Sequence, residues 1–134
     1  MNKTGVCCQL GLVILLAGCM AKGPTALQLS SADYGSHISP DKCVKIAEAQ
    51  LRSVLKDPFT AHFTHQPCYR GWRSSAPILG FDVEFGYVQN GTVNAKNSYG
   101  GYTGASNYNV LIKNGRVLRF CIEDDGICMP SRGS

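Results

Sequence analysis

Hydrophobic residues recur with the period of an α-helix in one segment of the first half of the chain. Four of them fall at positions i, i+4, i+7 and i+8 and form a single apolar stripe: Ala47, Leu51, Val54 and Leu55. Ser39 suits the N-cap of this helix, and Pro40 suits its first position. At the other end, Pro58 makes a helical backbone unfavourable for Asp57. The pattern therefore predicts a helix that begins after Ser39 and ends before Pro58.

The hydrophobic period changes to two after this helix, which is typical of half-buried β-strands. Apolar side chains alternate there with polar residues or glycine at four positions: Phe81, Val83, Phe85 and Tyr87. Asn-Gly pairs at residues 90–91 and 114–115 each predict a tight hairpin turn. The strands expected around these turns are residues 81–87, 93–95, 108–113 and 117–121.

Together these elements predict an α+β fold, in which one N-terminal helix packs on a small antiparallel β-meander of about four strands. The domain is expected to span residues 41–134, with Phe59 and Phe63 closing the edge of its core. Residues 20–40 are rich in Gly, Pro, Ser and other small residues. They predict a flexible tether with one short strand at Ala26–Leu29.

The N-terminus carries the pattern of an export signal. Lys3 precedes an apolar run from Leu10 to Ala17, which is shorter than the roughly 20 residues that a membrane-spanning helix needs. The run ends in Leu-Ala-Gly-Cys at residues 16–19, which resembles the lipobox of bacterial lipoproteins. The alternatives are a plain signal peptide with a coincidental cysteine, or a buried N-terminal helix.

The lipobox resemblance implies a signal peptide over residues 1–18 and a lipidated cysteine at Cys19. Residues 19–40 would then be the lipidated cysteine and its tether, and acyl chains such as palmitate would hold the protein to a membrane. Sorting in this class of proteins uses Asp after the cysteine for inner-membrane retention, and Met20 stands there instead. The resemblance therefore implies a location at the outer membrane, facing the periplasm.

The charge of the mature chain excludes one class of partner. Cleavage before Cys19 removes Lys3, so the net charge would fall from +4 to +3. The sequence contains no basic run or stripe of the kind that binds nucleic acid. We therefore expect no nucleic-acid partner.

Four further cysteines remain in the mature chain, and an even number in an exported protein predicts two disulfides: Cys43, Cys68, Cys121 and Cys128. Three pairings are possible. The Asp-Asp-Gly turn signal between the last two favours a local Cys121–Cys128 bond, which leaves Cys43 with Cys68. A metal site is the rival interpretation, but the CxxC spacings are absent, so we expect no metal and no cofactor.

Candidate catalytic residues are sparse. His62 and His65 lack the glutamate spacing of a zinc-protease helix, and Glu123 begins a carboxylate run that lacks the spacing of a calcium loop. No serine lies in a nucleophile-elbow pattern, and no glycine-rich phosphate loop joins a strand to a helix. The sequence therefore predicts a protein that is not an enzyme. The alternative is a small hydrolase that uses His62 or His65 with a carboxylate.

The stretch from Val93 to Tyr108 is rich in Gly, Asn and Tyr, and Lys96 is its only charged residue. One interpretation is geometric, because glycine and asparagine allow a wide bend between two strands. The other is recognition, because Tyr, Ser, Gly and Asn make adaptable binding surfaces and suit the faces of sugars. The candidate binding residues are Asn94, Lys96, Asn97, Tyr99 and Tyr102.

Two blocks of sequence resemble small, mostly uncharacterised proteobacterial envelope proteins. These blocks are LKDPFTAHF at residues 55–63 and VNAKNSYGGYTG at residues 93–104, which fit a pattern LxDPxxAxF followed by NAKNxxGGYxG. The family carries Cys-Gly shortly before the second block, where this chain has Asn90-Gly91. The resemblance implies a similar fold and an envelope location, but no biochemical role.

We therefore expect an outer-membrane lipoprotein that acts by binding. Its partner would be a protein of an envelope assembly, such as a secretion or conjugation apparatus, or the peptidoglycan of the cell wall. The alternative is a periplasmic inhibitor or ligand-binding module.

Overall fold

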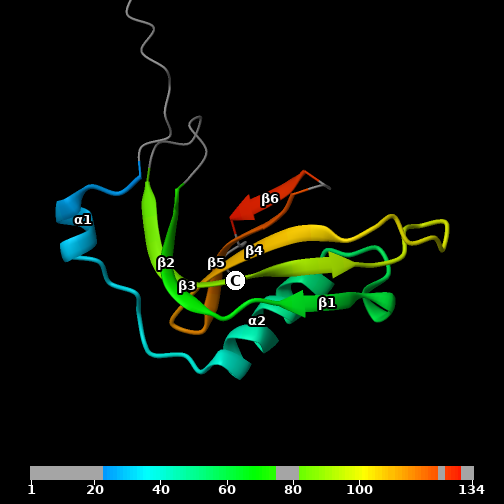
Figure 1. The fold of residues 1–134 in the computed structure, drawn as a ribbon, viewed down its shortest axis with the longest axis horizontal. Helices are drawn as coiled ribbons and strands as arrows, with labels where there is room; N and C mark the ends of the chain where they lie inside the picture. Colours follow the sequence, from blue (N-terminus) through cyan, green and yellow to red (C-terminus); the bar gives the residue numbers. More distant parts are fainter. Residues whose placement is uncertain (1–22, 75–81, 124–125, 131–134) are drawn as a thin grey trace, which may run out of the picture.

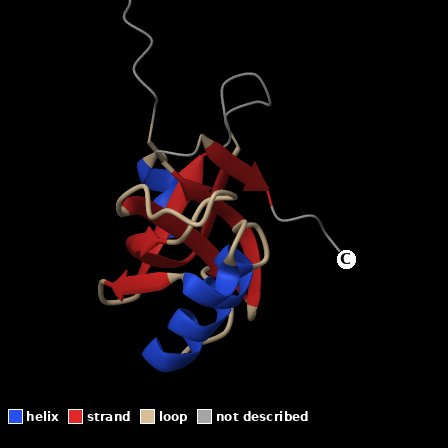
Figure 2. Ribbon diagram, turned by 90° about the vertical axis from the view of Figure 1, so that its right-hand side faces the viewer, coloured by secondary structure: helices blue, strands red, loops and turns tan. Residues whose placement is uncertain are grey.

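The computed structural model describes residues 23–74, 82–123 and 126–130 of the chain. Cys19 and Phe81 lie outside these ranges, as does the Asp-Asp pair at residues 124–125. The elements in chain order are α1 (Ala26–Ser30), α2 (Pro40–Arg52), a 3₁₀ turn η1 (Pro58–Thr60), β1 (His62–His65), β2 (Tyr69–Ser74), β3 (Val83–Asn94), β4 (Ser106–Lys113), β5 (Arg116–Ile122) and β6 (Ile127–Pro130) (Figures 1 and 2).

The strands form one antiparallel sheet in the order β1-β3-β4-β5-β6, and β2 pairs with the first part of β3. The α+β prediction is confirmed, but the sheet has six strands and not about four. β3 pairs with β2 over residues 83–88 and with β1 over residues 91–94. Figure 1 shows that β3 changes direction between these two parts. The additional strands β1, β2 and β6 are short, and Pro67 separates the first two.

Helix α2 packs one face on the sheet, as its apolar stripe predicts (Figure 2). Ser39 caps the helix by accepting a hydrogen bond from the backbone N–H of Lys42. The helix ends at Arg52, well before Pro58, and the Ser53 hydroxyl donates to the Gln50 carbonyl at 2.6 Å. Such local hydrogen bonds compete with helix continuation.

The core lies between α2 and the sheet. Burying a leucine side chain such as Leu51 in this layer contributes about 1.5–3 kcal/mol to the free energy of unfolding. The fully or almost fully buried residues of this layer come from α2, β4 and β5: Cys43, Ala47, Leu51, Tyr108, Val110, Ile112, Phe120 and Ile122. Val54 and Leu55 follow the helix and pack against its edge.

The predicted strand at Ala26–Leu29 is wrong, because these residues form helix α1. Thr25 and Gln28 form a reciprocal capping box around the first turn, which favours a helix over a strand. As a result, α2 is not the first helix in the chain. After α1, the Tyr34 ring packs edge-on against Phe85, and Ile38 is buried. Part of the segment that the sequence assigns to a tether therefore lies against the sheet.

Both predicted disulfide pairs are confirmed. Cys43–Cys68 joins α2 to the connection between β1 and β2, with a Cα–Cα distance of 6.5 Å. Cys121–Cys128 joins directly opposed residues of β5 and β6, with a Cα–Cα distance of 4.1 Å. One bond thus fixes the helix to the sheet, and the other fixes the last strand to its neighbour.

Only one of the two Asn-Gly pairs forms a hairpin turn. Asn114 and Gly115 have φ angles of 52° and 75°, which is the conformation that a tight turn between β4 and β5 requires. The turn predicted at Asn90-Gly91 is wrong, because both residues lie inside β3. A Cβ atom on Gly91 would lie 1.9 Å from the Thr64 carbonyl oxygen of β1. Glycine is needed there for close strand contact and not for a turn.

We predict that Gly91→Ala destabilises the protein by about 2–4 kcal/mol, because β1 must move away from β3 to admit the methyl group. Urea unfolding of the oxidised protein measures the change. Gly101→Ala is the matched control, since its Cβ would meet nothing closer than 3.9 Å. Equal stabilities for the two variants would contradict the strand contact.

Candidate functional site

Exposed aromatic side chains gather at one end of the molecule. Loop 95–105, which joins β3 to β4, and η1 both lie at the right-hand end in Figure 1. Phe59 of η1 is 96% exposed, while Tyr99 and Tyr102 of the loop are 97% and 46% exposed. With Lys96 they form a surface that we call the aromatic end. The prediction that Phe59 closes the core is wrong, whereas Phe63 does pack against the core.

The loop is held in place by contacts with η1 and β1. The backbone N–H of Lys96 donates to the Thr60 hydroxyl at 3.1 Å, and the Tyr102 hydroxyl donates to the Thr60 carbonyl at 3.1 Å. His62 Nε2 also lies 3.1 Å from the Tyr102 hydroxyl. The Lys96 ammonium lies 5.6 Å from the centre of the Tyr102 ring, a cation–π contact. The exposed rings are therefore presented on a fixed support.

Asn97 shapes the tip of this loop. Its side-chain oxygen accepts hydrogen bonds from the backbone N–H groups of Tyr99 and Gly101, at 2.9 and 3.1 Å. Gly100 and Gly104 have φ angles of 80° and 114°, which glycine adopts without strain. The geometric interpretation of this stretch and its display of aromatic rings therefore coexist.

The five candidate binding residues separate into two groups. Lys96, Tyr99 and Tyr102 come together at the aromatic end. Asn97 instead holds the turn, and Asn94 ends β3 opposite His62. The sequence missed Phe59 as a surface residue, because an apolar residue near a predicted core suggests burial.

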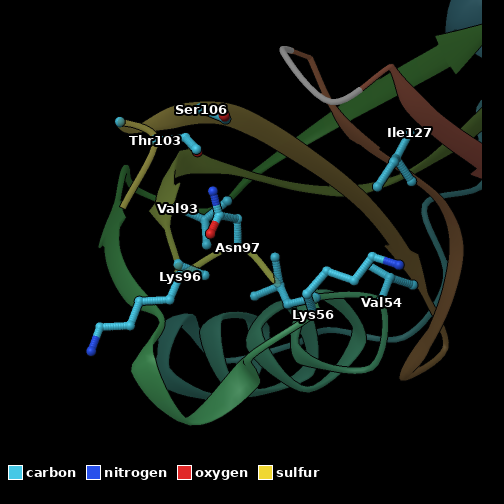
Figure 3. Close-up of a pocket in the computed structure, with 11 residues that line it drawn as sticks. Val54, Lys56, Val93, Lys96, Asn97, Thr103, Ser106 and Ile127 are labelled. Carbon is cyan, nitrogen blue, oxygen red and sulfur yellow. The ribbon is translucent and has the colours of Figure 1, made fainter. Parts of the chain in front are cut away.

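A cavity of about 280 Å³ lies between the end of α2 and the base of the loop (Figure 3). Figure 3 shows Lys96 pointing away from this cavity. Its apolar lining is Val54, Leu55, Val93, Ala95 and Ile127, and its polar lining is Lys56, Lys96, Asn97, Thr103 and Ser106, with Gly104 completing it. Apart from Lys96, the lining thus combines an apolar surface with Lys56, a few neutral polar groups and no carboxylate. Such a cavity suits an apolar group.

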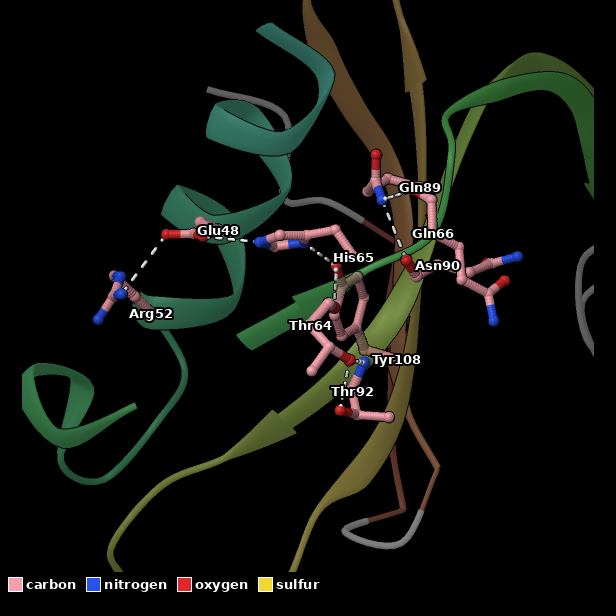
Figure 4. Close-up of polar contacts among 9 residues, drawn as sticks. All are labelled: Glu48, Arg52, Thr64, His65, Gln66, Gln89, Asn90, Thr92 and Tyr108. Atoms are coloured by element: carbon pink, nitrogen blue, oxygen red, sulfur yellow. Dashed lines mark hydrogen bonds and ion pairs between the residues drawn. The ribbon is translucent and has the colours of Figure 1, made fainter. Parts of the chain in front are cut away.

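A second group of polar residues links α2 to the sheet (Figure 4). His65 Nε2 lies 2.9 Å from a Glu48 carboxylate oxygen, which can only accept, so Nε2 carries the proton. His65 Nδ1 lies 2.7 Å from the Tyr108 hydroxyl. Glu48 also forms a 3.4 Å ion pair with Arg52, one turn along the helix. The chain Glu48–His65–Tyr108 therefore bridges α2, β1 and β4.

The hydrogen-bonded series Glu48–His65–Tyr108 resembles what the hydrolase alternative requires, since it pairs His65 with a carboxylate. Its hydroxyl member is Tyr108, which is 2% exposed, and burial raises the pKa of Tyr108 to about 12. A buried phenol that stays protonated is a poor nucleophile. His62 contacts Tyr102 instead. The arrangement suits a cross-link between helix and sheet.

Two searches of the described residues give negative results. They contain no group of three or more His, Cys, Asp and Glu residues placed to hold a metal ion. They also contain no helix that is long and apolar enough to cross a membrane. Comparison of the chain with protein-family models, with curated proteins and with solved structures found no match.

We predict that part of the stability is lost in alkali through Tyr108. Its pKa is about 12 in the folded protein against an ordinary 10.0, so folding favours the protonated phenol. This contribution is complete below about pH 10 and declines as the pH rises toward 12. Urea unfolding at pH 8 and pH 11 should show a smaller loss of stability for Tyr108→Phe than for the unmodified protein. An equal loss in both proteins would contradict the assignment.

Proposed function

We propose that this protein is a lipid-anchored accessory component of the bacterial envelope, and that it acts by docking its aromatic end onto a partner protein. The observation that carries the proposal is the almost complete exposure of Phe59 and Tyr99 on a loop and turn that are hydrogen-bonded to each other. Aromatic side chains dominate the energetics of protein interfaces. Their fixed support lowers the entropy lost on binding.

The surroundings of these rings indicate the chemistry of the partner. The adjacent cavity offers apolar surface from Val54, Val93 and Ile127. Lys56 lines the same cavity and Lys96 places its ammonium beside the Tyr102 ring, and no carboxylate is among the residues that line the cavity. A protein surface that inserts an apolar side chain and carries acidic groups beside it would complement this end.

An anchor at the N-terminus is compatible with docking through the aromatic end. In Figure 1 the first described residues and α1 lie on the left, while the aromatic end lies on the right. A lipid on Cys19 would leave the aromatic end on the side away from the anchored terminus. The protein would act without catalysis, in an assembly such as a secretion or conjugation apparatus.

The same surface can serve the alternative of a periplasmic inhibitor. An inhibitor forms a complex with a soluble protein in a fixed stoichiometry, whereas an accessory component contacts a membrane-bound assembly. Fractionation of the complex before detergent extraction distinguishes the two.

We predict that a photo-crosslinking amino acid at position 59 or 99 captures one envelope protein in intact cells. Phe59→Ser and Tyr99→Ser together should weaken that complex by about tenfold or more, because interface aromatics are typical hot spots. The matched control is Leu27, which is 77% exposed on α1. Crosslinking at position 27 should capture nothing, and Leu27→Ser should leave the complex unchanged.

Two results would count against protein docking at the aromatic end. One is equal crosslinking at positions 27, 59 and 99. The other is co-sedimentation of the protein with purified peptidoglycan sacculi that is lost in the Phe59→Ser/Tyr99→Ser variant. The second result would make the cell wall the partner at this end.

We predict that Cys19→Ser abolishes membrane anchoring, because the acyl chains attach to this thiol. Fractionation of cells should show the variant in the soluble periplasm and no longer in the outer membrane. Metabolic labelling with palmitate should be lost as well. Cys7→Ser is the control and should change neither result, since Cys7 belongs to the expected signal peptide.

A further inference from the structure

A second cavity lies on the sheet face opposite α2. Its volume is about 240 Å³ and its polar lining comes from six side chains: Gln66, Arg73, Asn90, Asn107, Asn109 and Glu123. We call it the asparagine cavity. Asn90 and Asn109 are cross-strand partners in β3 and β4. Side chains alternate between the two faces of a strand, and the intervening Tyr108 and Val110 belong to the core beneath α2. The asparagines therefore face away from the helix.

Arg73 fixes the orientation of two of these amides. Its Nε donates to the Asn109 side-chain oxygen at 3.2 Å, and its Nη2 donates to the Asn90 side-chain oxygen at 3.1 Å. Its third group donates to the Trp72 carbonyl at 2.9 Å. Because Arg73 occupies both amide oxygens, the NH₂ group of Asn109 can donate to a ligand, whereas that of Asn90 also donates to the Tyr69 hydroxyl. Within the described part of the chain, the NH₂ group of Asn109 has no hydrogen-bond partner.

Asn107 and Glu123 supply acceptors beside these donors. The Asn107 NH₂ group lies 3.5 Å from one Glu123 carboxylate oxygen, at the limit of a hydrogen bond. Among the described residues, neither the Asn107 side-chain oxygen nor the second carboxylate oxygen accepts a hydrogen bond, so both can accept one from a ligand. A hydroxyl group both donates and accepts, so it can pair with either kind of group. Fixed donors and acceptors in one cavity thus suit a ligand rich in hydroxyl groups.

The charge and the small apolar surface of the cavity limit which kinds of ligand it can bind. It holds one cation and one carboxylate, and Arg73 is already occupied by neutral oxygens, so neither an anion nor a cation is favoured. Apart from Tyr108, which belongs to the core and is 2% exposed, the lining offers no large apolar side chain for a protein partner to bury. At its border, Tyr69 is 46% exposed and its hydroxyl lies 3.4 Å from the Asn90 NH₂ group. An exposed ring beside polar groups provides a stacking surface for a flat, partly apolar ligand.

From these contacts we infer that the asparagine cavity binds a neutral saccharide. The amides and Glu123 would hydrogen-bond its hydroxyl groups, and Tyr69 would pack against one sugar face. From the sequence we expect any sugar recognition to use the candidate residues of the stretch 93–104. This cavity instead uses side chains from five places in the chain: Gln66, β2, β3, β4 and Glu123. It lies apart from the aromatic end and does not depend on the function proposed for that end.

The test uses the mature protein as purified from cells, labelled with isotope on its asparagine side chains, and follows the NH₂ resonances by NMR. The probes are chitotetraose, a neutral N-acetylated glycan, and maltotetraose, a neutral glycan without acetamido groups. We expect saturable shifts of the Asn90, Asn107 and Asn109 resonances. Shifts with chitotetraose alone indicate a cell-wall type of glycan, and shifts with both indicate general saccharide binding. No saturable shift with either sugar would overturn the inference.

Two sets of variants make the assignment specific. Asn107→Ala and Glu123→Gln alter exposed groups and should weaken sugar binding by about tenfold, as expected for losing hydrogen bonds to a fixed site. Unchanged affinity in both would overturn the site. The Phe59→Ser/Tyr99→Ser variant should bind sugar normally even where protein docking is lost. If that folded variant loses sugar binding instead, the saccharide site is not the asparagine cavity.

Discussion

Backbone pairing along β3 is the constraint on which the rest of the structure depends. Three other strands form their hydrogen bonds with this one strand: β2 along its first part, β1 along its second, and β4 along most of its length. The second pairing brings the Thr64 carbonyl so close to β3 that only glycine fits at position 91. Because β1 is placed in this way, η1 and Thr60 lie where the loop after β3 can bond to them.

The loop is therefore supported by the fold and not only by its own residues. Thr60 accepts from Tyr102 and from the backbone of Lys96, and Thr60 is itself positioned by the start of β1. On the other side of β1, His65 connects to Glu48 of α2 and to Tyr108 of β4. A short strand thus carries contacts to the core at one end and to the exposed aromatic rings at the other.

Much of this architecture is predictable from the sequence, and the failures have physical causes. The helix, the turn at Asn114 and both disulfides follow from periodicity, capping and cysteine spacing. β1 and β6 have only four residues each, and β2 (YRGWRS) shows no alternation of apolar and polar residues, so nothing local distinguishes these strands from loops. Gly91 follows an asparagine, and this pair predicts a turn. The close contact of Gly91 with β1 depends on a strand distant in the sequence, so the local sequence cannot predict it.

The candidate sites show the same division. Lys96, Tyr99 and Tyr102 share a segment whose composition suggests a surface. Phe59 joins them only through the fold, and its exposure contradicts what an apolar residue beside a helix suggests. The asparagine cavity is invisible in the sequence, because Arg73, Asn90 and Asn109 come from three different strands.

The Cys43–Cys68 bond would have a mechanical consequence if the protein is anchored at one end and docked at the other, as we propose. The bond joins two cysteines that are 25 positions apart in the sequence, and the ring that it closes contains most of α2, η1 and β1. By a chain-entropy argument, closing a ring of this size contributes about 3–4 kcal/mol. If a partner pulled on Phe59, the shorter arm of the ring, from Phe59 to Cys68, would limit how far the ring could extend. Because β1 lies in this arm, tension between membrane and partner would fall on the backbone hydrogen bonds between β1 and β3.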